Sequence, residues 1–463
     1  MNLAWYDKLI TSLPEVAAPK QKKLSFKEKI KWTLIVLVLF YILGLIPIAG
    51  LGANALQQFE FLSTILGASF GSIVSLGIGP IVTASIVLQL LNGSGLVKFD
   101  LTTHEGKMRF QGTQKIMSFA FTLLEAGIYV GMGGLSPAPG IPAGFLIFQI
   151  FLGGVIIMFM DEVVSKWGFG SGVSLFIAAG VAQDLFVRGL SFFKPQGAEG
   201  ATEFIGAVPR LFAALINQEP TTAMLALVPL IATGVVFALA VYAQAMKVEI
   251  PLSFGRIRGH GIRWPLNFIY TSNIPVILVA ALLANIQLFA TLLVQWGKPF
   301  LGDPNAGTGF VSWIMSPGGS GGLVGLLIRQ GSFAIGAKPY LQALFYVLLL
   351  MGGSVLFSMF WVQTSGLDAK NQARQMMASG LQIPGFRKDQ RVLERMLQRY
   401  IGPLTVMGAL TVGFLAAFAD LLGALTSGTG LLLTVMIVYR LYEDIARQHM
   451  YDMNPMMRKF MGG

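Results

Sequence analysis

Long runs without a charged residue constrain this chain more than any other feature. Eight such runs cover residues 32–59, 61–97, 126–160, 220–246, 264–297, 339–367, 400–419 and 421–439. A helix of about 20 apolar residues crosses the ~30 Å hydrocarbon core of a bilayer. Backbone amides in lipid must be satisfied within their own segment, so these runs must be helices. The sequence therefore predicts a polytopic α-helical membrane protein.

Composition and charge placement support the same interpretation. Only 12% of the 463 residues are charged, against about 25% in soluble domains. We expect ten spans, at 32–50, 74–94, 114–134, 143–161, 171–188, 221–246, 267–294, 340–363, 400–419 and 424–442. With the N-terminus inside, 27 of the 33 Lys and Arg residues fall in cytoplasmic segments and 6 in outer loops. By the positive-inside rule, both termini are expected in the cytoplasm.

The ten spans predict two halves of five. The expected parts are a cytoplasmic arm without a signal-peptide pattern at 1–31, an N-terminal half at 32–190, an outer loop at 191–220, a C-terminal half at 221–445 and a cytoplasmic tail at 446–463. The second span contains Ile78-Gly79-Pro80-Ile81-Val82, and the seventh contains Asn273-Ile274-Pro275-Val276-Ile277. Five spans separate these motifs, so they run in opposite directions, as in inverted repeats around a central pathway. A shared Ile–Pro motif is also common by chance, and both explanations stay open.

The segment before the second span is unlike a simple transmembrane helix. The uncharged run 61–97 has 37 residues, too many for one span and too few for two with a turn. Its first part, 59–72, is interrupted by Gly67, Ser69 and Gly71. We expect a short re-entrant helix on the outer side, followed by a full span kinked near Pro80. Irregular backbone at this depth survives only where protein buries it or water reaches it, so this segment is predicted to be a pore or cavity element.

Few residues could support catalysis or hold a cofactor. The chain has no Cys, and its three His residues are scattered through predicted cytoplasmic segments, so no metal site is expected. No Gly-Lys-Ser/Thr sequence exists, which excludes a P-loop. Gly67-Ala68-Ser69-Phe70-Gly71 fits a nucleophile elbow, but that elbow needs a preceding strand and a His partner. Small residues at this spacing are more typical of close helix packing, and no enzyme activity is expected.

Glu125 lies near the middle of the third span. A buried ionisable group usually faces the bundle interior and suggests a functional site, although a structural carboxylate bonded to Ser or Thr is an alternative. Asp161 and Glu162 lie at a span end, and Asp420 is expected to be solvated between the last two spans. The main alternative function is an ion-coupled secondary transporter, which would usually place several polar groups at the midplane. The predicted centre is instead mostly aliphatic.

Two predicted cytoplasmic loops, 247–265 and 364–399, are longer and more basic than topology requires. Their basic residues include Arg256, Arg258, Arg263, Arg387 and Lys388. Protruding basic loops can bind phosphate backbones or anionic lipid headgroups. They could also serve only as topology determinants.

Four stretches carry a resemblance to a known family. They are LGIGPIVTASIVLQLLNGSG at 76–95, WGFGSGVSLFIAAGV at 167–181, YTSNIPVIL at 270–278 and GTGLLLTVMIVYRLY at 428–442. Together they closely resemble SecY, the α subunit of the Sec protein-conducting channel, in its archaeal form. The resemblance covers nearly the whole length. It implies an all-α polytopic membrane protein with ten transmembrane helices in two inverted five-helix halves around a central hourglass pore. It also implies that the outer loop 191–220 is the hinge between the halves.

The resemblance implies roles for two groups of apolar residues. SecY pores narrow at a ring of aliphatic side chains, and the matching positions are Ile78, Val82, Val173, Ile177, Ile277 and Leu433. Such a ring can seal around an extended chain while solvating ions poorly. The re-entrant segment resembles the plug that blocks the closed pore from outside, with matching side chains Phe59, Leu62, Ile65, Leu66 and Phe70.

A side exit and several partners are also implied. Spans two and three against seven and eight resemble the lateral gate, and Thr83, Glu125 and Asn285 match its polar cluster. The two basic loops resemble those that bind the ribosome. Implied partners are SecE (γ) and Secβ/SecG-type small subunits, the ribosome, signal sequences and nascent polypeptides, the signal-recognition-particle receptor and anionic lipid. The implied function is passage of unfolded polypeptides across the plasma membrane and sideways release of transmembrane segments, powered by a partner such as the ribosome.

Overall fold

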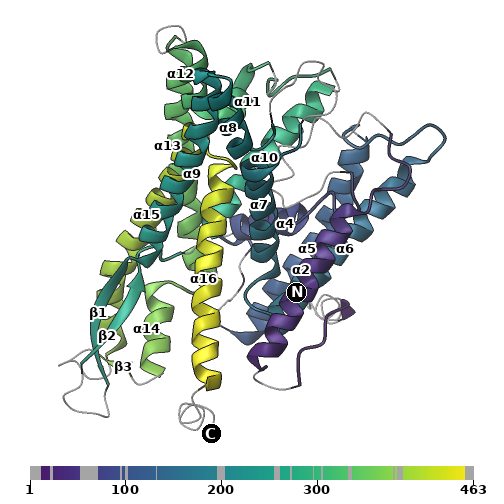
Figure 1. Ribbon diagram of the computed structural model, residues 1–463. Coiled ribbons are helices and arrows are strands. Elements are labelled where there is room, and N and C mark those ends of the chain that lie inside the picture. Colours follow the sequence, from purple (N-terminus) through teal and green to yellow (C-terminus); the bar gives the residue numbers. More distant parts are fainter. Residues whose placement is uncertain are drawn as a thin grey trace.

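The computed structural model is built mainly from long helices (Figure 1). It describes residues 12–20, 24–52, 71–93, 96–97, 99, 103–131, 133–194, 204–254, 261–271, 274–295, 297–303, 306–331, 336–378, 381–382 and 389–453. Ten helices follow the ten predicted spans in order. They are α2 (Phe26–Leu45), α4 (Gly79–Gly93), α5 (His104–Gly131), α6 (Ala143–Trp167), α7 (Gly172–Leu190), α9 (Pro220–Ala245), α10 (Ile274–Gln295), α13 (Lys338–Thr364), α15 (Gln390–Leu422) and α16 (Gly428–Met453).

The helix ends differ most from the predicted spans at the predicted cytoplasmic side. The helices α2, α5 and α15 begin earlier than the apolar runs they contain, and α16 continues beyond its run. These extra turns carry charged residues, so they lie outside the uncharged runs from which the spans were predicted. Six helices among the described residues are long and apolar enough to span a bilayer by composition alone. The helix α4 is apolar but shorter, and α5 and α16 have charged turns at one end.

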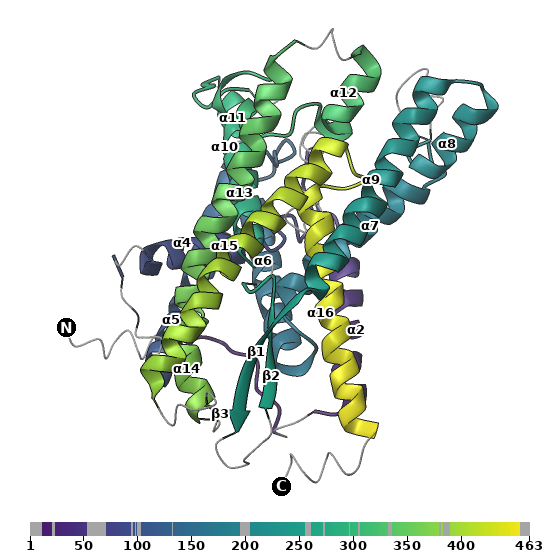
Figure 2. The ribbon, with the colours of Figure 1, turned by 90° about the vertical axis from the view of Figure 1, so that its left-hand side faces the viewer.

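The first five and the last five of these helices pack with the same pairings. In the N-terminal half, α5 contacts α4 and α6, and α6 contacts α2 and α7. In the C-terminal half, α13 contacts α10 and α15, and α15 contacts α9 and α16. The halves meet where α7 packs against α16, and where α4 packs against α10 and α13 (Figures 1 and 2). This correspondence supports the inverted repeat that the two Ile–Pro motifs suggested.

The irregular segment 71–78 before α4 is buried, as its depth in the membrane requires. Ser72, Val74, Ser75 and Leu76 are all 4% exposed or less. Backbone hydrogen bonds join this segment to residues 46–48 after α2, so its polar groups have partners inside the protein. The segment packs so closely on α6 that a Cβ on Gly153 would lie 1.8 Å from the Ile73 carbonyl oxygen.

The two basic loops form one compact unit at the end of the bundle where α16 finishes (Figures 1 and 2). The first loop folds into an antiparallel hairpin of β1 (Lys247–Phe254) and β2 (Gly261–Asn267), and the second contributes α14 (Ala369–Ala378) and β3 (Leu381–Gln382). The sheet order is β2-β1-β3, with Ile250 opposite Trp264 and Ser253 opposite Gln382. A hydrophobic cluster beneath it includes Ile250, Leu266, Met376 and Leu393. This small sheet was not expected from the sequence.

Short helices lie at the opposite end of the bundle. The helix α8 (Ala207–Ile216) falls within the predicted hinge loop 191–220 and packs on α9. The long outer segment 297–339 contains α11 (Gly309–Trp313), the 3₁₀ turn η1 (Gly319–Gly321) and α12 (Gly322–Gln330). These three elements make up about half of its described part.

Residues 14–17 of the N-terminal arm lie beside Lys115 of α5 and the end of α6, and we name them the N-terminal strap. Lys115 of α5 and Glu162 of α6 form an ion pair. The Glu162 carboxylate also accepts a hydrogen bond from the Val16 N–H at 2.9 Å. Lys166 donates to the Val16 carbonyl at 2.6 Å and to the Glu15 carboxylate at 2.5 Å. This hydrogen bond from Lys166 lowers the pKa of Glu15 below its ordinary value.

Candidate pore constriction and gate

The start of α4 places Ile78 and Val82. The chain leaves the buried turn and enters the helix with Pro80 in the first turn, where a missing N–H costs no helical hydrogen bond. The Val82 N–H donates to the Ile78 carbonyl at 3.1 Å, so the two side chains lie one turn apart on the same side of the helix. The helix α10 begins in the same way, with Pro275 in its first turn followed by Ile277.

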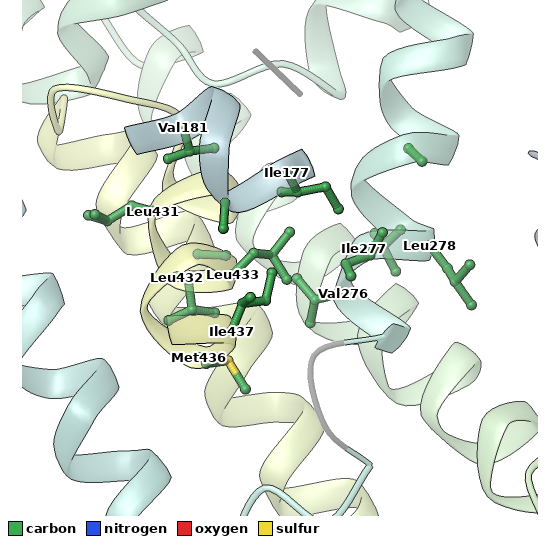
Figure 3. Packing of buried hydrophobic residues seen from close by; sticks show 14 of the residues in the cluster. Ile177, Val181, Val276, Ile277, Leu278, Leu431, Leu432, Leu433, Met436 and Ile437 are labelled. Atoms are coloured by element: carbon green, nitrogen blue, oxygen red, sulfur yellow. The ribbon is translucent and has the colours of Figure 1, made fainter. Parts of the chain in front are cut away.

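The helices α7 and α16 bring the remaining predicted ring residues to the same place. Val173 and Ile177 lie in the first turns of α7, and Leu433 lies in the second turn of α16. Figure 3 shows Ile177, Ile277 and Leu433 directed toward one another from three helices. The fully buried predicted members are Ile78, Val82, Ile177, Ile277 and Leu433, each at most 8% exposed and all in one cluster. Val173 is partly buried and packs against this cluster.

This arrangement makes a closed aliphatic junction between the two halves. We name the six residues Ile78, Val82, Val173, Ile177, Ile277 and Leu433 the constriction. Their side chains offer no hydrogen-bond donors or acceptors, so they solvate an ion poorly and favour exclusion of water. Aliphatic side chains can also pack around an extended polypeptide of any sequence, because dispersion contacts are not directional.

The three predicted gate residues also lie together. Asn285 Nδ2 of α10 donates to Thr83 Oγ1 of α4 at 3.2 Å. The Thr83 side chain is also hydrogen-bonded to Glu125 of α5, which is only 8% exposed. The Thr83 hydroxyl donates to the Gly79 carbonyl at 2.9 Å, which leaves its oxygen as the acceptor for Asn285. This polar cluster therefore joins α4 and α5 of one half to α10 of the other.

Several predicted site residues cannot be placed. The plug residues Phe59, Leu62, Ile65, Leu66 and Phe70 lie outside the described residues, as do Arg256, Arg258, Arg387 and Lys388. Arg263 is described. It lies on β2, is 79% exposed and pairs with Glu249 of β1 at 3.0 Å.

Two aspartates at helix ends have structural partners that the sequence analysis missed. The expectation that Asp420 is solvated is wrong, because its side chain lies between three helices. Its Oδ1 accepts from the Gly428 N–H at 2.6 Å, and its Oδ2 accepts from the Tyr346 hydroxyl at 2.6 Å. Asp161 Oδ1 accepts from the Val173 N–H at 2.8 Å.

A repeated motif could have identified this pair of aspartates. Gly154-x4-Phe159-x-Asp161 in α6 has the same spacing as Gly413-x4-Phe418-x-Asp420 in α15. Each copy is followed by a Ser-Gly pair that begins the next helix, Ser171-Gly172 or Ser427-Gly428.

Comparison with known proteins decides the family. The SecY family profile matches residues 72–442. A protein translocase subunit SecY of Methanothermobacter thermautotrophicus is 44% identical over 99% of this chain and 98% of its own length. The chain belongs to the SecY family. The protein translocase subunit SecY of Methanocaldococcus jannaschii is 42% identical over 98% of both chains.

Solved SecY-type structures share this fold. A protein-conducting channel superposes with a TM-score of 0.81 at 41% identity, covering 96% of this chain and 98% of the other. Sec61 in a canine ribosome–channel complex from the endoplasmic reticulum superposes with a TM-score of 0.77 at 41% identity, covering 96% of this chain and 98% of the other. The resemblance read from the sequence is therefore confirmed, and the SecY chain is a mainly helical, multi-pass membrane protein.

Proposed function

We propose that this SecY-family chain forms a protein-conducting channel that the constriction seals. The observation that carries this proposal is the meeting of aliphatic side chains from α4, α7, α10 and α16 in one buried cluster at the junction of the halves. Separating the halves would open this junction without breaking any hydrogen bond between constriction side chains. The seal would then close around the passing polypeptide by apolar contact alone.

The polar cluster of Thr83, Glu125 and Asn285 is proposed as the latch of a lateral gate. It lies where α4 and α5 face α10, next to the contact between α4 and α13. A single hydrogen bond joins Thr83 to Asn285 across the two halves, and such a bond contributes about 1 kcal/mol net. A latch of this strength would hold a closed gate and still yield to an apolar signal sequence.

Partners, location and domain roles follow from the same proposal. The hairpin unit of β1, β2, β3 and α14 would dock a ribosome, a partner supported by the canine ribosome–channel complex that contains the similar Sec61. Apolar side chains exposed along α9, including Leu227, Ile231 and Val235, would face lipid or single-span subunits of the SecE and Secβ/SecG type. The Lys and Arg distribution supports both termini in the cytoplasm. The family resemblance supports a plasma-membrane location, two five-helix halves, a hinge near 191–220 and a plug near 59–72.

Protease protection in proteoliposomes tests this function. The chain is purified with its membrane partners and reconstituted, and ribosomes translate a secretory protein onto the vesicles. We expect the secretory protein to become protease-resistant only in vesicles that contain the channel. Equal protection in vesicles without it would contradict the proposal.

The same assay separates the channel from the ion-coupled transporter. Glu125 is the buried carboxylate that a proton-coupled carrier would use, and Glu125→Gln should abolish activity in such a carrier. In the channel, Glu125→Gln keeps a hydrogen-bonding side chain and should change only the gating equilibrium. Complete loss of export in a normally assembled variant would favour the transporter.

A further inference from the structure

The two aspartates missed by the sequence analysis occupy equivalent places in the two halves. Asp161 lies near the end of α6, the fourth long helix of its half, and Asp420 lies near the end of α15, the fourth of the other. Each carboxylate accepts from a backbone N–H in the first turn of the fifth helix, α7 or α16. An aspartate that accepts from free N–H groups at a helix N-terminus is a strong cap, since it also complements the helix dipole.

The glycines of the repeated motif hold each capped helix close to its partner. A Cβ on Gly172 would lie 2.5 Å from Asp161 Cα, and a Cβ on Gly428 would lie 2.1 Å from the Ala416 carbonyl oxygen. The earlier glycines of the motif repeat this at the third helix of each half. A Cβ on Gly154 would lie 2.5 Å from Thr122 of α5, and one on Gly413 would lie 2.9 Å from Leu350 of α13. The two motifs therefore lock α5, α6 and α7, and α13, α15 and α16, in the same way.

The caps lie at opposite ends of the bundle. Asp161 is close to the junction where the Phe169 N–H donates to Thr33 of α2 and where Trp167 donates to the strap carbonyl of Ala17. Asp420 is at the other end, where its carbonyl accepts from the Ser316 hydroxyl of the outer segment. An inverted repeat requires this placement.

Each capped helix carries a constriction residue at the same distance from its cap. Ile177 follows Gly172 by five residues, and Leu433 follows Gly428 by five residues. At about 1.5 Å of rise per residue, each side chain lies about 7.5 Å along the helix from the capped end. One turn further, Val181 and Ile437 also match, and Figure 3 shows both pairs in the central cluster.

We propose that Asp161 and Asp420 are equivalent positioning residues, which fix the start of α7 and of α16 and thereby set the depth of Ile177 and Leu433 in the constriction. This inference rests on the proposed channel function. The caps are made by side chains of neighbouring helices, so they set where each helix begins relative to the rest of its half. A helix released from its cap could slide or rotate, and its constriction side chain would no longer meet the others.

Ion conductance of the reconstituted complex tests this role. Asp161→Ala and Asp420→Ala should each raise the resting conductance several-fold. Asp161→Asn and Asp420→Asn should keep it near wild type, because an amide oxygen still accepts from the helix N–H groups. Gly172→Ala and Gly428→Ala should raise it by a different route, since the added Cβ displaces the helix while the carboxylate stays.

Two controls make the result decisive. Ser358→Ala removes a buried bond to Thr271 (2.8 Å) away from both caps, so it should lower the melting temperature without raising conductance. Ile177→Gly and Leu433→Gly remove constriction residues directly.

Wild-type conductance in both Asp→Ala variants, with leak in the Ile177→Gly and Leu433→Gly variants, would overturn the positioning role and leave the proposed channel function intact. Equal leak in the Asp→Asn and Asp→Ala variants, or in Ser358→Ala, would also overturn it. Absence of leak in the Ile177→Gly and Leu433→Gly variants would instead contradict the proposed function.

Discussion

The two halves repeat the same backbone plan but tie it together with different side chains. In the C-terminal half, Asp420 joins three helices, because it caps α16 from α15 and also accepts from Tyr346 of α13. In the N-terminal half, Asp161 caps α7 from α6, and its partners among the described residues all lie at the start of α7. There, α5 is instead held through Lys115, which pairs with Glu162 beside Asp161 and donates to a strap carbonyl. The third helix is thus bonded to the capping aspartate itself in one half, and to the residue beside it and the strap in the other.

This difference suggests which half moves. Tyr346 is only 7% exposed, whereas the side chains of Lys115 and Glu162 are 15% and 19% exposed. A helix held through a buried hydrogen bond is harder to displace than one held by a partly exposed ion pair, which solvent screens. We therefore expect α4 and α5 to move more readily than α10 and α13 when the gate opens. The repeat supplies matched positions for comparing the halves.

The largest effect is expected when constriction residues are replaced in matched pairs. Val82→Gly and Ile277→Gly occupy equivalent places after Pro80 and Pro275, and both should raise the resting ion leak strongly. Each also loses roughly 2–5 kcal/mol of packing stability. Planar-bilayer conductance measures the leak. If only one member of the pair leaked, the constriction would belong to one half rather than to the junction.

Loss of the two caps should lower the stability of the protein to different extents. Asp420→Ala removes a cap, at about 1 kcal/mol. It also deprives the buried Tyr346 hydroxyl of its partner, at about 1–3 kcal/mol. Asp161→Ala removes a cap, at about 1 kcal/mol. The apparent melting temperature in detergent should therefore fall further for Asp420→Ala. Tyr346→Phe is the matched test, because it removes only the additional bond. In that background, the fall in melting temperature caused by Asp420→Ala should approach the fall caused by Asp161→Ala. A larger fall for Asp161→Ala would contradict the comparison.

Much of this architecture could be predicted from the sequence, because bilayer thickness and hydrogen-bond satisfaction leave few choices. The ten helices, the buried turn before α4 and the meeting of Thr83, Glu125 and Asn285 all agree with expectation. The grouping of the constriction residues, like that of Thr83, Glu125 and Asn285, came from the family resemblance, since an isolated residue in a span says nothing about what it faces.

The features that sequence reasoning missed have a common cause. The hairpin of β1 and β2 is short and alternates apolar residues in a loop, and a search for apolar helices does not detect it. Asp420 is bounded by uncharged runs, so it was assigned to solvent by its position between spans. Its partners, Tyr346 and Gly428, are placed by tertiary packing. Comparing the two halves residue by residue would have revealed the repeated Gly-x4-Phe-x-Asp motif.

A smaller effect is expected at the hydrogen bond between the halves. Asn285→Leu removes the bond to Thr83, worth about 1 kcal/mol, and should favour gate opening. Export of a secretory protein with a weakened signal sequence should therefore rise. Gln287→Leu, two residues along α10 and on a different side of the helix, is the control and should leave export unchanged. An equal rise in both variants would show that added apolarity, rather than loss of the latch, is responsible.

The smallest effect is expected at the strap, which ties only the N-terminal half. The ion pair of Glu15 and Lys166 lowers the pKa of Glu15 below 4.5, so its contribution is complete above that pH. It is lost as the pH falls through the lowered value. Because the Glu15 side chain is 68% exposed, solvent screens most of the interaction. Limited proteolysis of the arm should accelerate slightly on acidification in wild type, and Glu15→Gln should remove that dependence. An unchanged pH profile in Glu15→Gln would assign it to another group.

Crosslinking from both halves to one nascent chain tests the central claim most directly. Because the chain has no Cys, single cysteines at Ile177 and Leu433 can be compared with one at Ile231, which is 55% exposed on α9. A ribosome is stalled on a secretory chain that carries one cysteine within the membrane-spanning stretch. The account predicts disulfides to Ile177→Cys and Leu433→Cys with similar yield, and none to Ile231→Cys. Crosslinks to one half alone, or equal crosslinking to Ile231→Cys, would mean that the polypeptide does not pass through the junction of the two halves.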